Sequence, residues 1–278
     1  MSAQKFDISG NIRRFTFSWD ILVINEAPVS IFVVTTEVGV ILIDCGHQSF
    51  RQQVKNILPP KIDYLLITHS HVDHIGNLDL ISEMFPDAKI LIHEREYDLG
   101  IPTLSGNLRI FPKSKYRDIK GDAMIYNIPR FLHLLEEISW KPFILKNKVL
   151  VFNDSGEFKD NDIPVQLNIT KYIKIVNTKG HTPGHSSFHI CEENILIVGD
   201  ALTNVFPNPL KCRKLTQSAK LGTPIPMSTS NMSDAKSSIV RLDNYAKTNN
   251  IKMLYPSHDN CNGVTASQLD VFAKTLIK

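Results

Sequence analysis

The sequence predicts an α/β protein built on a mixed sheet, because short apolar and β-branched runs alternate with segments of helical periodicity. Residues 30–36 and 40–44 are two β-branched runs that flank the turn residues Glu37-Val38-Gly39, an arrangement typical of a hairpin. A hairpin followed by alternating strands and helices favours a mixed sheet over a purely parallel βαβ winding.

The remaining elements follow in order along the chain. Residues 61–68 are a short apolar run after two prolines, which indicates a buried strand. Residues 233–247 indicate an amphipathic helix that packs on a sheet, with apolar Ile239, Val240, Leu242 and Tyr245 on one side. We expect further strands at 89–93, 172–177, 195–198 and 252–255, and a further helix at 78–85.

Length and composition allow one large hydrophobic core. The 278 residues are 42% hydrophobic and 21% charged, as in an ordinary globular protein, so we expect a single domain over residues 1–278. No apolar run approaches the roughly 18 residues of a membrane helix, and no apolar signal core begins the chain. The scattered cysteines indicate neither a thiolate zinc site nor a disulfide framework. These features favour a cytoplasmic protein.

Residues 94–170 break the alternation of strands and helices. Two interpretations stay open: an insertion that covers the functional site as a lid, or a separate small core, with a helix over residues 128–140 in either case. The segment is rich in aromatic residues, namely Phe111, Tyr116, Tyr126, Phe131, Trp140, Phe143, Phe152 and Phe158.

Positive charge gathers in two clusters, although the net charge is only +3. Such clusters bind an anionic substrate or RNA, or they are solvated loop charge. We favour solvated charge, because no aromatic interleaving or nucleic-acid-binding signature accompanies them. The clusters are Lys113, Lys115, Arg117 and Lys120, and Lys211, Arg213, Lys214 and Lys220.

The run His69-Ser-His71-Val-Asp73-His74 directly follows the predicted strand at 61–68 and carries the strongest chemical signal. In extended chain, positions i and i+2 point the same way, so His69 and His71 can hold one metal ion. The chain then turns before the helix at 78–85, so Asp73 and His74 face a second point and can hold a second ion. Imidazole and carboxylate ligands suit zinc, iron or manganese.

Three more metal-competent residues stand just beyond predicted apolar strands. His181, Asp200 and His258 each follow such a strand, and a rigid sheet fixes the positions of groups at its strand ends. His185 lies four residues after His181, and the spacing alone does not choose between these two histidines.

Taken together, these motifs resemble those of metallo-β-lactamase-fold proteins over roughly residues 20–93 and 172–265. The matching parts are HxHxDH at 69–74, GHTPGH at 180–185, Asp200 after a strand and His258 after the last strand. The resemblance implies a four-layer αβ/βα sandwich with the metals at one edge of two facing sheets.

The resemblance also implies roles for these residues. His69, His71 and His181 would hold the first ion, Asp73, His74 and His258 the second, and Asp200 would bridge both. In relatives with this turn the first histidine is the ligand, so His185 becomes a packing or supporting residue. Asp44 matches an early aspartate that accepts hydrogen bonds from a ligand imidazole or from the ligand loop. His93 has no ligand role in such relatives.

Two ions at this site would share an activated water, so we expect a dinuclear zinc hydrolase in which Asp73 orients the attacking hydroxide and carries its proton. The expected substrate is a small, partly apolar ester, thioester or lactone, as in the glyoxalase II and quorum-signal lactonase branches. Those lactonases place a tyrosine where this chain has Thr203. We expect no membrane partner and no nucleic acid, and the resemblance allows a homo-oligomer.

Two alternatives on the same fold stay open. A mononuclear iron enzyme similar to persulfide dioxygenases would use His69, His181 and Asp200. A phosphodiesterase or nuclease would reveal itself by salt-dependent RNA binding. Iron or manganese is also possible in place of the two zinc ions.

Overall fold

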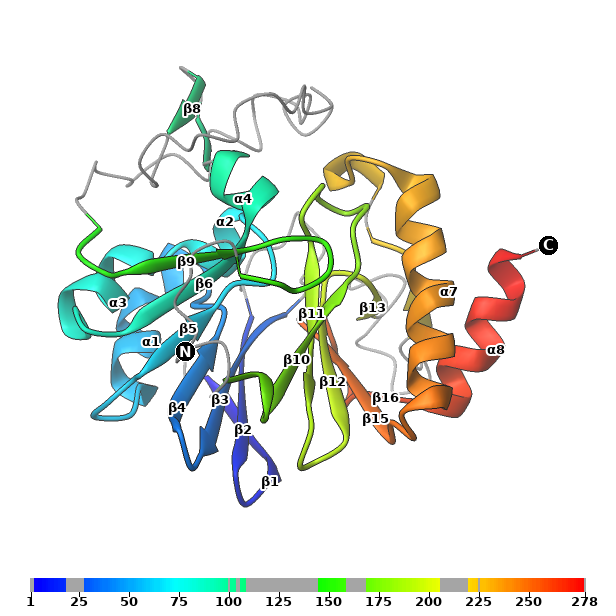
Figure 1. The fold of residues 1–278 in the computed structure, drawn as a ribbon, viewed down its shortest axis with the longest axis horizontal. Coiled ribbons are helices and arrows are strands. Elements are labelled where there is room, and N and C mark those ends of the chain that lie inside the picture. The colour runs from blue at the N-terminus through cyan, green and yellow to red at the C-terminus, as the bar shows by residue number, and fades with distance from the viewer. Residues whose placement is uncertain are drawn as a thin grey trace.

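The computed structural model describes residues 3–18, 28–99, 101–103, 106–108, 145–158, 169–205, 220–224 and 226–277. Two large sheets face each other through the middle of the molecule, and helices lie on both outer sides (Figure 1). The predicted mixed α/β class is therefore confirmed, and so is its layered sandwich form.

The first sheet has seven strands in the order β1-β2-β3-β4-β5-β6-β9. Strands β1 to β4 pair antiparallel, whereas β4, β5, β6 and β9 pair parallel, so the sheet is mixed as expected. The strands are β1 (Gln4–Ser9), β2 (Ile12–Phe17), β3 (Val29–Thr36), β4 (Gly39–Ile43), β5 (Tyr64–Leu66), β6 (Lys89–His93) and β9 (Val149–Phe152).

The second sheet has five strands in the order β10-β11-β12-β15-β16. Only the β12–β15 pair is parallel. The strands are β10 (Ile173–Asn177), β11 (Ser186–Ile190), β12 (Ile195–Gly199), β15 (Met253–Pro256) and β16 (Val264–Thr265). Two small ribbons are separate from both sheets: β7 (Ile101–Thr103) with β8 (Gly106–Leu108), and β13 (Thr203–Val205) with β14 (Lys220–Gly222).

Three apolar layers hold the sandwich together. The central layer lies between the sheets, where the rings of Phe32 and Tyr255 meet edge to face with centroids 6.4 Å apart. The outer face of the first sheet packs against α1 (Arg51–Ile57) and α3 (Leu78–Met84). The outer face of the second packs against α7 (Met232–Thr248) and α8 (Ala266–Leu276). Each large apolar side chain buried in these layers contributes about 1.5–3 kcal/mol.

The predicted elements match the observed ones, with shifted ends. Helix α7 begins after Asn231, whose side chain accepts hydrogen bonds from the backbone N–H groups of Ser233 and Asp234. The strand expected over 61–68 pairs only at Tyr64–Leu66. It ends there because the backbone N–H of Thr68 donates to the Asp44 carboxylate rather than to a neighbouring strand.

The segment 94–170 contributes described structure at both of its ends. Helix α4 (Glu94–Leu99) follows β6 directly, and β9 joins the first sheet as an edge strand parallel to β6. The predicted helix at 128–140 lies outside the described residues, as do both basic clusters apart from Lys220. Among the described helices, none is long and apolar enough to cross a membrane.

Candidate metal centre

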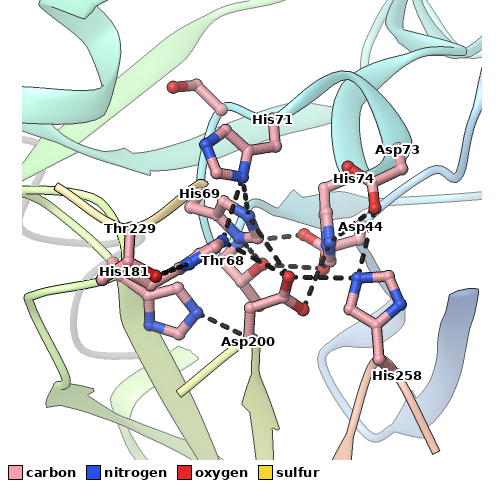
Figure 2. Close-up of polar contacts among 12 residues, drawn as sticks. Asp44, Thr68, His69, His71, Asp73, His74, His181, Asp200, Thr229 and His258 are labelled. Carbon is pink, nitrogen blue, oxygen red and sulfur yellow. Dashed lines mark hydrogen bonds and ion pairs between the residues drawn. The ribbon is translucent and has the colours of Figure 1, made fainter. Parts of the chain in front are cut away.

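The candidate site lies where four strands end at a common edge of the sandwich. Strand β4 leads to Asp44, β5 to His69, β12 to Asp200 and β15 to His258. Because β4 is parallel to β5 and β12 is parallel to β15, the carboxyl ends within each pair coincide. Figure 2 shows the side chains from the two sheets pointing toward one another.

The first group consists of His69, His71 and His181, whose candidate ligand atoms all lie within 4.8 Å of one another. The Nδ1 atom of His71 is 3.0 Å from the Nε2 atom of His69 and 3.0 Å from the Nε2 atom of His181. Nitrogens around a tetrahedral zinc ion are about 3.3 Å apart, as Zn–N distances of about 2.0–2.1 Å require. Three imidazoles converging in this way have the spacing of a metal-ligand set.

The second group consists of Asp73, His74 and His258. The Oδ2 atom of Asp73 is 3.2 Å from Nε2 of His258 and 3.6 Å from Nε2 of His74. The carboxylate of Asp200 lies between the two groups. Its Oδ1 is 3.4 Å from Nε2 of His74, and its Oδ2 is 3.1 Å from Nε2 of His258 and 3.4 Å from Nε2 of His181.

Two orphaned atoms test whether these residues fit a metal. The Nε2 atom of His74 and the Oδ1 atom of Asp200 are buried without a hydrogen-bond partner among the described residues. Buried polar atoms are nearly always bonded, so a pair left open at one point indicates a missing ligand. Because both atoms can coordinate a divalent cation, the residues fit a metal site.

The second group and Asp200 form a tight cluster of charges in the metal-free protein. Burial disfavours charge on His258, but Asp200 and Asp73 outweigh it and raise its pKa to about 10. The pKa of His74 is raised for the same reason, with Asp200 the main opposing cause. Burial would raise the pKa of both carboxylates, yet the neighbouring histidines hold each one below its usual range. By contrast, burial lowers the pKa of His71 to about 3, which leaves that imidazole neutral.

Hydrogen bonds on the far side of the His258 and His69 rings fix which nitrogen faces the site. The Nδ1 atom of His258 donates to the carbonyl of Pro28 at 2.9 Å. The Nδ1 atom of His69 is 3.1 Å from the Thr68 hydroxyl, which itself donates to Asp44 and therefore accepts from the imidazole. Each bond turns Nε2 toward the site, as hydrogen bonds to the outer ring nitrogen do for metal-binding histidines.

Asp44 is the support that the sequence predicted. Its carboxylate accepts from the Thr68 backbone N–H and from Nδ1 of His74, both at 2.8 Å. Both expected partners, a ligand-loop backbone group and a candidate ligand imidazole, are therefore present. The backbone of Asp44 has φ 58°, a left-handed conformation that aspartate and asparagine tolerate better than most residues.

His185 stands apart from both groups. Its Nε2 accepts from the backbone N–H of Asp200 at 3.0 Å, and its Nδ1 is 2.8 Å from the Thr178 hydroxyl. Because both ring nitrogens already have partners, the geometry favours His181 as the metal ligand and makes His185 a support for Asp200. His93 lies outside both groups too, with its Nε2 3.0 Å from Asp154.

Two supporting residues were not foreseen from the sequence. Arg14 is fully buried and pairs with Asp259, the residue after His258, at 2.8 Å. It also donates to the Asp259 and Cys261 carbonyls, so it holds the turn that carries His258. The second is Glu96, which lies on α4 directly after β6. Its position shortly after a strand that ends at this edge is the sequence feature that could have identified it.

An αβ/βα sandwich with clustered histidines and aspartates at one edge defines a class of metal-binding enzyme folds. The chain belongs to the metallo-beta-lactamase superfamily, whose family model matches residues 24–258. The predicted family is thereby confirmed. Proteins of this superfamily are in general metal-dependent hydrolases.

Individual relatives match at low identity. The uncharacterized protein YobT of Bacillus subtilis is 31% identical over 177 residues, 63% of this chain and 62% of YobT, so the match spans less than two thirds of that relative. The metallo-beta-lactamase FIM-1 of Pseudomonas aeruginosa, in its mono-zinc form, superposes with TM-score 0.60 at 11% identity over 100% of this chain and 96% of its own. The Flv1 flavodiiron core of Synechocystis sp. PCC6803 superposes with TM-score 0.58 at 13% identity, over 99% of this chain and 61% of the Flv1 chain. Both structures share the fold.

Proposed function

We propose that this protein is a dinuclear zinc hydrolase. The observation that carries the proposal is the position of Asp200, whose carboxylate lies between the two groups. Its Oδ1 is 3.4 Å from Nε2 of His74 in the second group, and its Oδ2 is 3.4 Å from Nε2 of His181 in the first group and 3.1 Å from Nε2 of His258 in the second. A carboxylate placed in this way can bridge two ions, whereas a single-ion site would need no second group.

Two divalent ions, when bound, would lower the pKa of a shared water toward neutrality and polarise the oxygen of the scissile group. The chain's own contribution is to orient that water and move its proton. Asp73 suits this task, because its side chain is 22% exposed whereas that of Asp200 is 7% exposed. We assign Asp73 the catalytic role of holding the proton and passing it to the leaving group.

The substrate class is a small, partly apolar ester, thioester or lactone, as in the glyoxalase II and quorum-signal lactonase branches. The aromatic residues between positions 94 and 170 favour an apolar molecule over RNA. The Thr203 hydroxyl donates to the Thr223 carbonyl at 3.3 Å, so it is engaged within the protein. A residue at position 203 that is engaged in this way does not polarise a homoserine lactone, so the contact favours an ester or thioester substrate.

A second candidate is a mononuclear iron oxidoreductase. It would use His69, His181 and Asp200, whose Oδ2 atom lies 3.9 Å from His69 Nε2 and 3.4 Å from His181 Nε2. The likeness to the Flv1 flavodiiron core supports an iron protein on this fold, but a diiron core gives no support to a single-ion site. The orphaned His74 Nε2 favours the dinuclear hydrolase, because the mononuclear site gives it no partner.

The hydrolase proposal is tested with zinc-loaded protein and a panel of small aryl esters, thioesters and lactones, each assayed with and without a chelator. We expect chelator-sensitive hydrolysis of at least one class. Asp73→Asn should lower kcat by at least about 100-fold, the scale of a lost general acid–base group. Asp87→Asn, an exposed aspartate before β6, is the control and should keep full activity.

Two results would contradict this account. No turnover of any class by zinc-loaded protein would remove the hydrolase assignment. Full turnover by Asp73→Asn with an unchanged zinc content would remove the proton-transfer role of Asp73 and leave the hydrolase assignment standing.

A further inference from the structure

Glu96 is a completely buried carboxylate beside the candidate metal centre. It lies on α4, directly after β6, and accepts three hydrogen bonds. Its Oε2 accepts from the backbone N–H of Ser70 at 2.9 Å and from the Ser70 hydroxyl at 2.7 Å. Its Oε1 accepts from the backbone N–H of Gly184 at 2.7 Å.

The two partners of Glu96 belong to the two loops that build the first group. Ser70 lies between His69 and His71, in the loop after the first sheet's strand β5. Gly184 lies in the turn that begins with His181, between β10 and β11 of the second sheet. One side chain therefore connects ligand loops from opposite halves of the sandwich.

The close approach of Gly184 shows that this connection is built into the packing. A Cβ atom on Gly184 would come within 3.0 Å of Glu96 Oε1 and within 2.5 Å of His93 Nδ1. A larger residue would push the turn away from Glu96, so glycine is needed for the short 2.7 Å contact.

The chemistry of the contacts calls for a carboxylate. An ionised glutamate only accepts hydrogen bonds and can serve all three donors with its two oxygens. A glutamine has one oxygen and one amide nitrogen. Either the two Ser70 donors or the Gly184 N–H would therefore face the amide N–H groups instead of an acceptor. Burying a carboxylate is costly unless its lone pairs are satisfied, and the Ser70 and Gly184 donors satisfy them.

We propose that Glu96 is a positioning residue that sets the distance between His71 and His181, and thereby the metal affinity of the first group. These two imidazoles come from the loops that Glu96 joins, and their facing nitrogens are 3.0 Å apart. The proposal rests on the proposed metal function. Residues that orient metal ligands are typically worth about 10–100-fold in metal affinity.

The test is a zinc titration of the full-length, metal-free protein in competition with a chromophoric chelator. Glu96→Gln should weaken zinc binding at the first group by about tenfold or more. Ser70→Ala removes one of the three bonds and should weaken it by a smaller factor, about threefold. Asn147→Ala is the control, because Asn147 is a buried residue whose side chain makes two bonds, to the carbonyls of Phe85 and Ala88 at the far end of β6.

The control separates ligand positioning from general stability. We expect Asn147→Ala to lower the melting temperature of the metal-free protein while its zinc affinity stays at the wild-type value. Zinc affinity of Glu96→Gln within twofold of wild type would overturn the proposal. If Glu96→Gln does not fold, Ser70→Ala decides alone: a loss of affinity supports the role, and an unchanged affinity overturns it. Absence of zinc binding by the wild type would instead overturn the metal centre itself.

Discussion

Asp44 and His74 are joined by a 2.8 Å hydrogen bond between the aspartate Oδ2 and the imidazole Nδ1. The bond holds the Nδ1 proton in place, so Nε2 is the nitrogen of His74 that faces Asp200 Oδ1, 3.4 Å away, and that would release its proton to bind a metal. A residue at the end of β4 therefore decides which tautomer His74 presents to the second group.

Asp44→Asn tests this relationship, because asparagine has the same shape and also tolerates the left-handed backbone at this position. Its amide would donate to His74 Nδ1, which moves the imidazole proton to Nε2 and blocks coordination. We expect zinc affinity at the second group to fall by about 10–100-fold, with the first group unchanged. A zinc affinity at the second group equal to that of the wild type would show that Asp44 does not control the tautomer.

The two histidines of the 180–185 turn should behave differently. His181→Ala removes a nitrogen that lies 3.0 Å from His71 Nδ1, so zinc binding at the first group should be lost. His185→Ala removes a partner of the Asp200 backbone, so most of the zinc should remain while stability falls by about 1–3 kcal/mol. Elemental analysis and urea denaturation of both variants measure the two effects. Zinc loss in His185→Ala alone would reverse the assignment.

The pH dependence of zinc binding should differ between the groups. In the metal-free protein the pKa of His258 is about 10 and that of His74 is raised, so both are protonated at neutral pH. A metal must displace those protons, so affinity at the second group should rise with pH, by about tenfold per unit for each proton released. The pKa of His71 is lowered to about 3, so this imidazole is already neutral and releases no proton.

Titrations with a competing chelator at pH 6, 7 and 8 test that difference. We expect zinc affinity at the second group to rise steeply across this range and zinc affinity at the first group to change little. An equal pH dependence at the two sites would contradict the charge cluster described for the second group.

The buried Arg14–Asp259 pair should matter far more than a surface pair. Arg14→Met leaves Asp259 buried without its partner, which should lower the free energy of unfolding by about 3–5 kcal/mol. Lys5→Met is the control, because Lys5 pairs with Asp7 where both side chains are more than half exposed, and we expect no measurable change. Urea denaturation compares the two, and equal stabilities would contradict the structural role of Arg14.

Strands with continuous apolar runs were predictable, but strands whose polar residues are satisfied at long range were not. β2 contains Arg13 and Arg14 and does not resemble a buried strand, yet Arg14 is buried because Asp259 pairs with it across 245 positions. The pairing of Arg14 with Asp259 is not visible in a local window of sequence.

The candidate ligands were easier to predict than the residues that support them. The ligands form spaced motifs at strand ends, and the structure brings all of them together around Asp200. Glu96 has no such motif, because its contacts depend on how Gly184 packs from the other sheet. Asp44 was predictable because it matches the early aspartate of metallo-β-lactamase-fold proteins, and the structure places it at the end of a strand directly beside the one that leads to His69.

The central claim is that this chain holds two zinc ions, and elemental analysis of protein purified without added metal tests it most directly. The account predicts about two zinc ions per chain, falling to about one in Asp44→Asn as the second group weakens. One iron per chain, or no bound metal, would contradict the dinuclear zinc centre.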